Sequence, residues 1–460
     1  MAPATKALAL LLFTWALSIR AICSQSVVRT LPGFPGDLPF KLETGYVSVG
    51  EMEDVHLFYY FIESEGNPRE DPLLLWLTGG PGCSAFSGLV YEIGPVNFDT
   101  QHFDGKLPKL ILNPYSWTKV SNIIFLDAPV GTGFSYADNW RGYVLDDLLA
   151  ATEVYNFLMK WLVDHPQFLL NDLYIAGDSY SGLIVPNVVQ KIYRGKATGG
   201  YILGNPATHE HDDPNSRVEF VHRVALLSDG LYESTKNNCH GEYVNVDPNN
   251  AACIKDLDIV NACIKNIDMA QILEPNCALV SPNSTKLKWD RRFFQESPTS
   301  FLLPPFPRAR KLWCRVYNYV LSDIWANDEL VQKALHVRKG SIEKWVRCNK
   351  TLSYSEDLLT SFYYHKNLSN TDLRALIYSG DHDMVVPYVA THKWIEALEL
   401  PVDDDWRPWF VDGQIGGYTM KYVKKGYHLT FATGGGHTAP EYRPEECLAM
   451  FQRWLAYYAL

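Results

Sequence analysis

The 460-residue chain lacks any long uninterrupted hydrophobic run. Its most apolar stretch, residues 7–17, is too short to cross a membrane, which takes about 20 residues in a helix. Lys6 precedes this stretch, and small residues follow it near Ala21 and Ser24. We therefore expect residues 1–24 to be a cleaved signal peptide rather than an anchor, and we expect no membrane partner.

The chain also lacks an excess of positive charge. It contains 41 Lys and Arg against 52 Asp and Glu, a formal net charge of −11, and charges of both signs are interspersed. This balance argues against nucleic acid as a partner and suits an acidic compartment. No internal repeat is found along the sequence.

Cysteine is present but not abundant, with nine residues in the chain. Cys23 lies in the predicted signal peptide, so eight cysteines would enter an oxidising compartment, where disulfides form. Glycosylation sequons begin at Asn283, Asn349 and Asn367. These features predict a glycoprotein of the secretory pathway, located in a vacuole or outside the cell.

The most informative motif is GDSYSG at residues 177–182. It follows the apolar run 173–176 and precedes a helix-like segment, an order that is typical of a nucleophile elbow. Such an elbow presents a serine hydroxyl at the carboxyl end of a strand and requires small neighbours. Ser181 stands where the strict G-x-S-x-G pattern has glycine, so only a small residue is retained. We predict Ser179 as the nucleophile.

A base and an orienting acid are expected later in the chain, in the order serine, acid, histidine. The strand-like run 374–378 ends in SGDHD, which offers Asp381, with Asp383 as a rival. The run 429–432 is followed by TGGGH, in which three glycines allow the backbone to bring His437 close to another loop. We predict Asp381 as the orienting acid and His437 as the base.

An oxyanion hole requires backbone N–H groups beside the nucleophile. The apolar run 73–77 predicts a buried strand, and it opens into the glycine-rich loop TGGPGCS. Gly80 in this loop and Tyr180 after the nucleophile are the predicted donors.

The predicted catalytic residues span Ser179 to His437, so one core must contain both ends of the chain. We expect the core to comprise residues 25–204 and 339–460. Residues 205–338 form a cap insertion, within which the proline-rich and basic stretch 281–311 predicts an exposed linker.

Several separated motifs together resemble the serine carboxypeptidase family, in the same order and over nearly the whole mature chain. They are WLTGGPGCS at 76–84, PVGTGFSY at 129–136, the Ser179 elbow, VQKALH at 331–336 and the two loops that carry Asp381 and His437. The resemblance implies an α/β-hydrolase fold with a mostly parallel central sheet flanked by helices. It also implies an acid-active serine enzyme with Ser179, Asp381 and His437 as its triad.

Two positions depart from the peptidase pattern. Carboxypeptidases of this family bind the terminal carboxylate of a peptide with an asparagine in the first glycine loop, a glutamate before the nucleophile and a further glutamate. Here the last is kept as Glu92, but Thr78 and Asp178 stand at the other two positions. The motifs around Thr78, Gly79 and Asp178 instead resemble the plant serine carboxypeptidase-like acyltransferases, which move an acyl group from a 1-O-β-glucose ester to an acceptor.

The resemblance further implies three disulfides, Cys83–Cys348, Cys239–Cys253 and Cys277–Cys314, which leaves Cys263 and Cys447 unassigned. It also implies maturation into two disulfide-linked chains. No cofactor and no metal are expected. We interpret the histidine-rich segment 209–213 as a solvent-exposed loop rather than a metal site. The expected function is acyl transfer between an acyl-glucose donor and an acceptor of specialised metabolism. The alternatives are a carboxypeptidase that acts at acidic pH and a catalytically silent binding protein.

Overall fold

The computed structural model describes residues 25–103, 105–193, 198–276 and 315–460. The predicted signal peptide, the predicted linker 281–311, Asn283, Cys277 and Cys314 lie outside these ranges.

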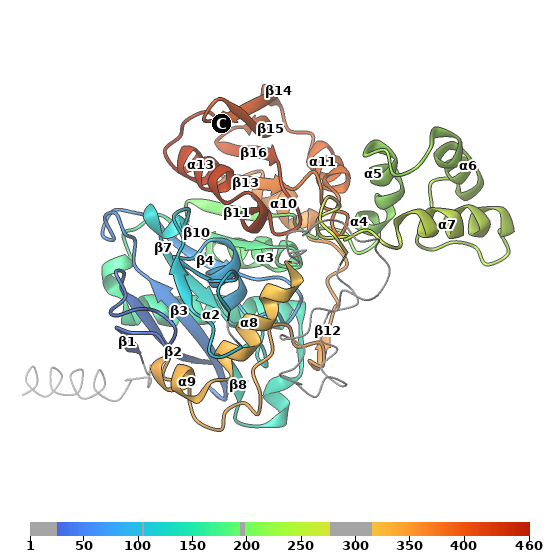
Figure 1. The fold of residues 1–460 in the computed structure, drawn as a ribbon. Coiled ribbons are helices and arrows are strands. Elements are labelled where there is room, and N and C mark those ends of the chain that lie inside the picture. Colours follow the sequence, from blue (N-terminus) through green and yellow to red (C-terminus); the bar gives the residue numbers. More distant parts are fainter. Residues whose placement is uncertain (1–24, 104, 194–197, 277–314) are drawn as a thin grey trace, which may run out of the picture.

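A 12-stranded sheet forms the centre of the molecule (Figure 1). Its main path, from one edge to the other, is β1 (Ser26–Val28), β2 (Leu42–Val49), β3 (Val55–Ile62), β7 (Asn122–Leu126), β4 (Leu73–Leu77), β10 (Leu173–Asp178), β11 (Gly200–Gly204), β13 (Arg374–Ser379), β16 (Tyr427–Thr433), β15 (Gln414–Lys424) and β14 (Val402–Val411), with β8 (Tyr136–Ala137) paired to β3. The six strands from β7 to β16 run parallel, and both edges are antiparallel. All four strand-like runs predicted at 73–77, 173–176, 374–378 and 429–432 belong to this parallel part.

Helices cover both faces of the sheet. One face packs against α2 (Asp147–Asp164), α3 (Ser181–Tyr193) and α11 (Tyr388–Glu396), in a core that includes Phe157, Val185 and Trp394. The other packs against α8 (Val316–Ala326), α9 (Glu329–Ala334) and α13 (Pro444–Leu455), in a core that includes Trp325 and Phe451. Burial on both faces explains why the parallel strands are apolar throughout.

The remaining elements are short. They are β5 (Val96–Phe98), β6 (Leu110–Leu112), β9 (Leu145–Asp146), β12 (Tyr354–Ser355), α10 (Phe362–Leu368), α12 (Ala439–Tyr442), the π-helical turn η1 (Gly88–Glu92) and the 3₁₀ turns η2 (Trp117–Lys119), η3 (Trp140–Tyr143) and η4 (Pro166–Phe168).

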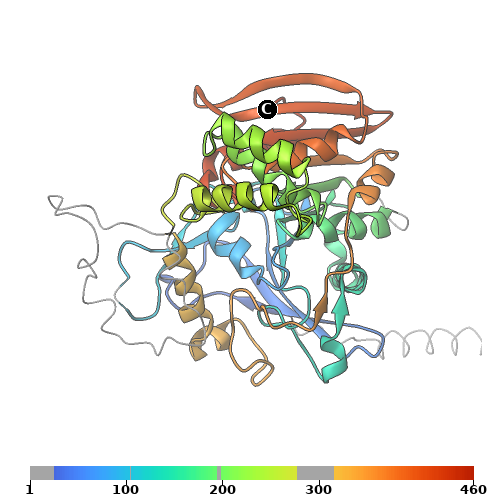
Figure 2. The ribbon, with the colours of Figure 1, turned by 90° about the vertical axis from the view of Figure 1, so that its right-hand side faces the viewer.

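The predicted cap insertion divides into two parts. Helices α4 (Asp212–Asn215), α5 (Arg217–Arg223), α6 (Asp229–Cys239) and α7 (Ala251–Ile264) form a lobe that projects from the body in Figure 1 and faces the viewer in Figure 2. By contrast, α8 and α9 pack into the core of the body through Trp325 and Val331. The predicted range 205–338 is therefore longer than the projecting lobe.

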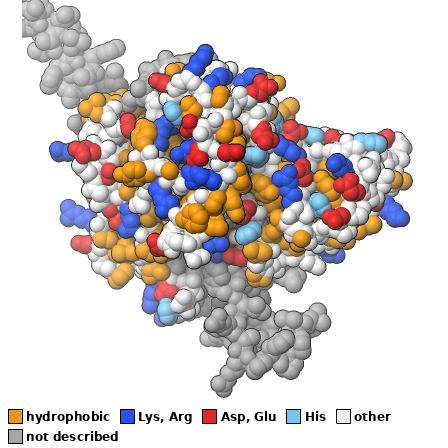
Figure 3. Space-filling view, turned by 90° about the horizontal axis from the view of Figure 1, so that it is seen from above, with side chains coloured by type: hydrophobic (Ala, Val, Ile, Leu, Met, Phe, Trp, Pro, Cys, Tyr) orange, Lys and Arg blue, Asp and Glu red, His pale blue; other side chains and the backbone are white. Residues whose placement is uncertain are grey.

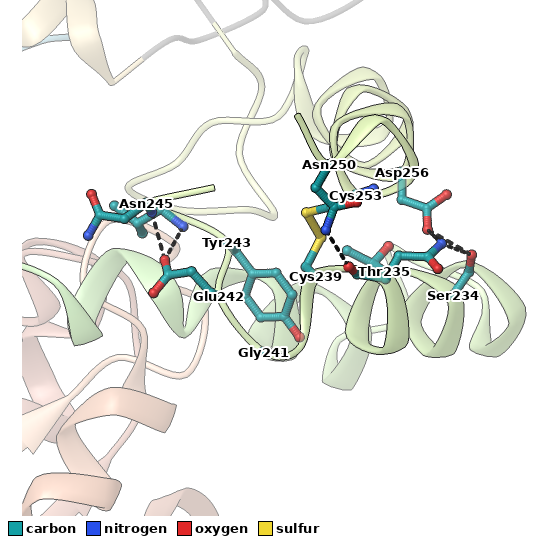
Figure 4. The surroundings of a disulfide bond; sticks show 12 residues. Ser234, Thr235, Cys239, Gly241, Glu242, Tyr243, Asn245, Asn250, Cys253 and Asp256 are labelled. Atoms are coloured by element: carbon teal, nitrogen blue, oxygen red, sulfur yellow. Dashed lines mark hydrogen bonds between the residues drawn. A yellow bond between two sulfur atoms is a disulfide. The ribbon is translucent and has the colours of Figure 1, made fainter. Parts of the chain in front are cut away.

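Two disulfides lie in the described part of the chain. Cys239 at the end of α6 bonds to Cys253 in the first turn of α7, where Asn250 caps α7 and also donates its side-chain amide to the backbone of Asn238 (Figure 4). The second joins Cys83 to Cys348, which are 265 residues apart in sequence. Both are pairs that the family resemblance implies. Among the described cysteines, Cys263 and Cys447 are unpaired.

Figure 3 looks down on the β14–β15 end of the molecule. Positive and negative side chains are interspersed over this face, so it presents no continuous basic surface. Within the described ranges, no helix combines the length and the apolar character needed to cross a bilayer.

Candidate active site

Ser179 lies in the turn between β10 and α3 and has a φ of 53°, a left-handed conformation that is unusual for a residue other than glycine. The turn is crowded: a Cβ on Gly177 would lie 2.4 Å from the Leu77 carbonyl oxygen, and one on Gly182 would lie 2.4 Å from the Ala207 carbonyl oxygen. Ser181, where the sequence departs from the strict motif, is buried and donates its hydroxyl to the Leu77 carbonyl at 2.9 Å. A small polar residue therefore fits here in place of glycine.

His437 contacts both the nucleophile and an acid. Its Nε2 lies 2.9 Å from Ser179 Oγ, and its Nδ1 lies 2.7 Å from Asp383 Oδ2. This is the arrangement of a serine nucleophile, a general base and an orienting carboxylate.

The prediction of Asp381 as the orienting acid is corrected by this geometry. In the turn after β13, the Asp383 N–H donates to the Gly380 carbonyl. The Asp383 side chain is fully buried next to His437. Asp381 instead accepts the Gly435 N–H at 3.2 Å. It therefore braces the backbone of the histidine loop rather than the imidazole.

The pKa of His437 is raised above its usual value. Burial lowers it, but the adjacent Asp383 carboxylate and its hydrogen bond outweigh burial because they stabilise the imidazolium. A base that accepts the serine proton benefits from this stabilisation.

Sequence reasoning missed two contacts that hold the Asp383 loop and the His437 loop. Asn205, directly after β11, donates its amide to Asp383 Oδ2 at 2.8 Å. Its position at a strand end, before Pro206, was the one available signal. The carbonyl of Ala270, a residue of the predicted cap insertion, accepts the His437 N–H at 2.7 Å; no sequence pattern marks it.

The glycine-rich loop that carries Gly80 lies against the elbow. A Cβ on Gly79 would lie 2.6 Å from Ser179 Cβ and 2.8 Å from the Tyr180 nitrogen, so only glycine lets the first loop approach this closely. Among the hydrogen bonds of the described residues, neither the Gly80 N–H nor the Tyr180 N–H donates to a protein acceptor. Both are therefore available to a ligand oxygen.

The positions that depart from the peptidase pattern are engaged within the protein. Thr78 Oγ1 accepts the Trp76 indole N–H at 3.2 Å, and Asp178 Oδ1 accepts the Gly79 N–H at 3.1 Å. Glu92 is buried, and its Oε2 has no hydrogen-bond partner among the described residues. One acceptor near the site is thus left unsatisfied by the protein.

Burial shifts the pKa of both carboxyl groups upward. Burial raises the pKa of Asp178 to about 6, and burial together with the Asp178 charge raises the pKa of Glu92 well above its usual range. The charge of His437, and more weakly that of Arg347, lowers the pKa of Asp178, and Arg347 lowers that of Glu92. Two neighbouring buried carboxyls resist double ionisation, so at acidic pH at least one carries a proton.

No cluster of three or more potential metal ligands occurs in the described ranges. In the histidine-rich loop, His211 pairs with Asp212 and Glu242, and Asp213 accepts backbone N–H groups. Of the two described sequons, Asn367 is exposed on α10, whereas Asn349 donates its side-chain amide to the Gly131 carbonyl.

Comparison with known proteins agrees with this architecture. The family model described as serine carboxypeptidase matches residues 32–457. Serine carboxypeptidase-like 7 of Arabidopsis thaliana is 48% identical over 443 residues, which cover 94% of each chain. Serine carboxypeptidase-like 2 of the same plant is 47% identical, over 98% of this chain and 97% of the relative.

A solved structure shares the fold. The prohormone-processing carboxypeptidase from Saccharomyces cerevisiae superposes with a TM-score of 0.68 and 17% identity, over 93% of this chain and 94% of the other. The predicted α/β-hydrolase fold is confirmed. With its family match over almost the entire length and its assembled serine, histidine and aspartate, the chain belongs to the serine carboxypeptidase family.

Proposed function

We propose that the protein is an acyltransferase that moves an acyl group from a 1-O-β-glucose ester to an alcohol or amine acceptor. The observation that carries the proposal is the state of Thr78 and Asp178. Their side chains bond to Trp76 and Gly79, so they do not form the amide-and-glutamate pair that holds a peptide carboxylate in carboxypeptidases of this family. A site with a misplaced partner is penalised by unpaired polar groups, so peptide binding should be weak.

In the first half-reaction, His437 Nε2 accepts the proton of Ser179 Oγ as the oxygen attacks the acyl carbonyl. The Gly80 and Tyr180 N–H groups would stabilise the negative charge on the carbonyl oxygen. The bond to the glucose oxygen then breaks, and His437 returns its proton to that oxygen. A Ser179 ester and free glucose result.

In the second half-reaction, the acceptor hydroxyl or amine loses its proton to His437 and attacks the Ser179 ester. The proton returns to Ser179 as the acylated product leaves. Net transfer requires that the acceptor be held and water excluded. A protonated Glu92 or Asp178 would donate a hydrogen bond to a sugar or acyl oxygen, in keeping with their raised pKa values.

Carboxypeptidase activity is the second candidate, favoured by the retained Glu92 and by the shared fold. A silent binding protein is disfavoured because the nucleophile, the base and the acid are in hydrogen-bond contact. For the setting, we propose a secreted or vacuolar glycoprotein, in line with the leader-like N-terminus and the sequons.

The decisive experiment incubates the purified protein with a panel of acyl-glucoses and acceptors, and in parallel with a blocked dipeptide, and identifies products by mass. Acylated acceptor and free glucose support the proposal. Efficient dipeptide cleavage with no reaction of any glucose ester would replace it with the carboxypeptidase alternative. Ser179→Ala is the control in both arms.

A further inference from the structure

Asp147 is a buried carboxylate outside the triad that contacts the residue after the nucleophile. It lies in the first turn of α2 and is 0% exposed. Its Oδ1 accepts the Tyr180 hydroxyl at 2.8 Å and the Tyr354 hydroxyl at 2.7 Å, and its Oδ2 accepts the Leu358 N–H at 2.8 Å. Three donors on one buried carboxylate make a rigid junction.

Tyr180 is held at both ends by this arrangement. Its backbone lies in the elbow, where its N–H is unused by the protein, and its phenol is anchored to a different helix through Asp147. Burial and the hydrogen bond to Asp147 raise the pKa of Tyr180, so the phenol remains a neutral donor. The orientation of the peptide unit at Tyr180 therefore depends on a carboxylate that does not touch the nucleophile.

The same junction reaches the other side of the predicted oxyanion hole. Tyr354 and Leu358 belong to a segment that begins at Asn349, whose N–H donates to the Gly82 carbonyl at 2.8 Å. The Leu352 side chain fills the space beside Gly82, where a Cβ would lie only 2.7 Å away. Asp147 thus links the elbow to the segment that supports the first glycine loop.

We propose that Asp147 is a positioning residue for the oxyanion hole: by holding the Tyr180 phenol and the 349–358 segment, it aims the Tyr180 N–H at the acyl oxygen. This role rests on the acyl-enzyme chemistry of the proposed function. Loss of a whole oxyanion donor costs about 100- to 1,000-fold in rate. A misaimed donor should cost about 10- to 100-fold by the same argument.

The test uses p-nitrophenyl acetate, whose acylation of Ser179 needs the triad and the oxyanion hole but no recognition of glucose. The acylation rate constant and the apparent ester dissociation constant are measured by burst kinetics. For Asp147→Asn and for Tyr180→Phe, we expect the rate constant to fall about 10- to 100-fold while the dissociation constant changes less than about twofold. Binding of a boronic acid that mimics the tetrahedral intermediate should weaken in the same proportion.

The double variant discriminates further. If Asp147 acts through Tyr180, the double variant should be no slower than the slower single variant. The matched control is Asp146→Asn, on the adjacent carboxylate that caps α2 by accepting the Leu149 N–H. Asparagine also caps helices, so this variant should react like the wild-type enzyme.

Unchanged acylation in folded Tyr180→Phe, or strictly additive losses in the double variant, would overturn the proposal. Tyr180→Phe retains the buried carboxylate, so it decides the question even if Asp147→Asn fails to fold. A wild-type enzyme that releases p-nitrophenol no faster than Ser179→Ala would remove the acyl-enzyme itself and the role of Asp147 with it. Failure to use glucose esters, with the burst intact, would refute only the proposed donor.

Discussion

The Asp383 carboxylate lies 2.7 Å from Nδ1 of His437, although Asp381 is the first aspartate after strand β13. Asp383 also accepts the Asn205 amide and the N–H groups of Val385 and Val386, so with His437 its orientation is set by four donors. A carboxylate held in this way can keep the imidazole in one tautomer, which is the function of the acid in a serine triad.

The first prediction compares two variants in which either Asp383 or Asp381 is replaced by asparagine. Asp383→Asn should lower kcat by about 10,000-fold because the neutral amide no longer orients and stabilises the imidazolium. Asp381→Asn, the matched control, should stay within about 10-fold because its partner is the Gly435 N–H. Hydrolysis of a p-nitrophenyl ester measures both, with Ser179→Ala as the inactive reference. A larger loss in Asp381→Asn than in Asp383→Asn would reverse the assignment.

The second prediction concerns restoration of the carboxylate clamp. Thr78→Asn with Asp178→Glu should raise dipeptide hydrolysis and lower acyl transfer from a glucose ester about 10-fold, which corresponds to about 1.4 kcal/mol of donor recognition. The two single variants serve as controls, since neither alone rebuilds the pair. Thermal unfolding must accompany the assay because Thr78 packs closely: a Cβ on Gly88 would lie 3.3 Å from its Oγ1. Equal transfer by the double variant and the wild-type enzyme would contradict the proposed role of these positions.

The third prediction is a dependence of stability on pH. Burial raises the pKa of Asp127 to about 7, although it accepts hydrogen bonds from Ser84 and from two backbone N–H groups. Because the folded pKa exceeds the unfolded value, the stabilisation is complete below the unfolded pKa and is lost as the pH rises through about 7. Between these values, the contribution of Asp127 to the free energy of unfolding should fall by up to about 1.4 kcal/mol per pH unit.

Comparison with Asp127→Asn isolates this group from the other titrating residues. The stability advantage of the wild-type protein over Asp127→Asn should be smaller at pH 8 than at pH 5, measured by urea unfolding. The exposed Asp403→Asn should show no such trend. An advantage that stayed constant or grew between pH 5 and pH 8 would contradict the prediction, because the Asp127 carboxyl would then bind no more protons in the folded protein than in the unfolded chain.

The fourth prediction is proteolytic maturation within residues 281–311, based on the prolines and basic residues of that stretch. The fragments should remain joined because Cys83 and Cys348 lie on opposite sides of the cut and are bonded to each other. Gels of the native enzyme with and without reduction test both points. One full-length mature band under reduction would argue against cleavage, and two bands without reduction would argue against the bridge in the native enzyme.

The local elements of the site could be predicted from the sequence because each depends on a short pattern. Residues 73–77 are apolar without interruption, as a strand buried on both faces must be. Ser179 follows such a strand, with the small residues Gly177 and Ser181 two positions away on either side. The three glycines before His437 likewise mark a backbone that bends sharply after β16.

The partners of those elements were decided by tertiary structure. Whether Asp381 or Asp383 faces His437 depends on how the turn after β13 packs against the histidine loop. Both residues are aspartates in the same short loop, so the sequence does not distinguish them. Asn205 and Asp147 come from segments far from Ser179 in the chain, and only the packing of β11 and α2 beside β10 and α3 brings them to the site. The sequence alone thus determined which strands are followed by loops that carry catalytic residues. The direction of each carboxylate was set by long-range packing and hydrogen bonding, which no local pattern encodes.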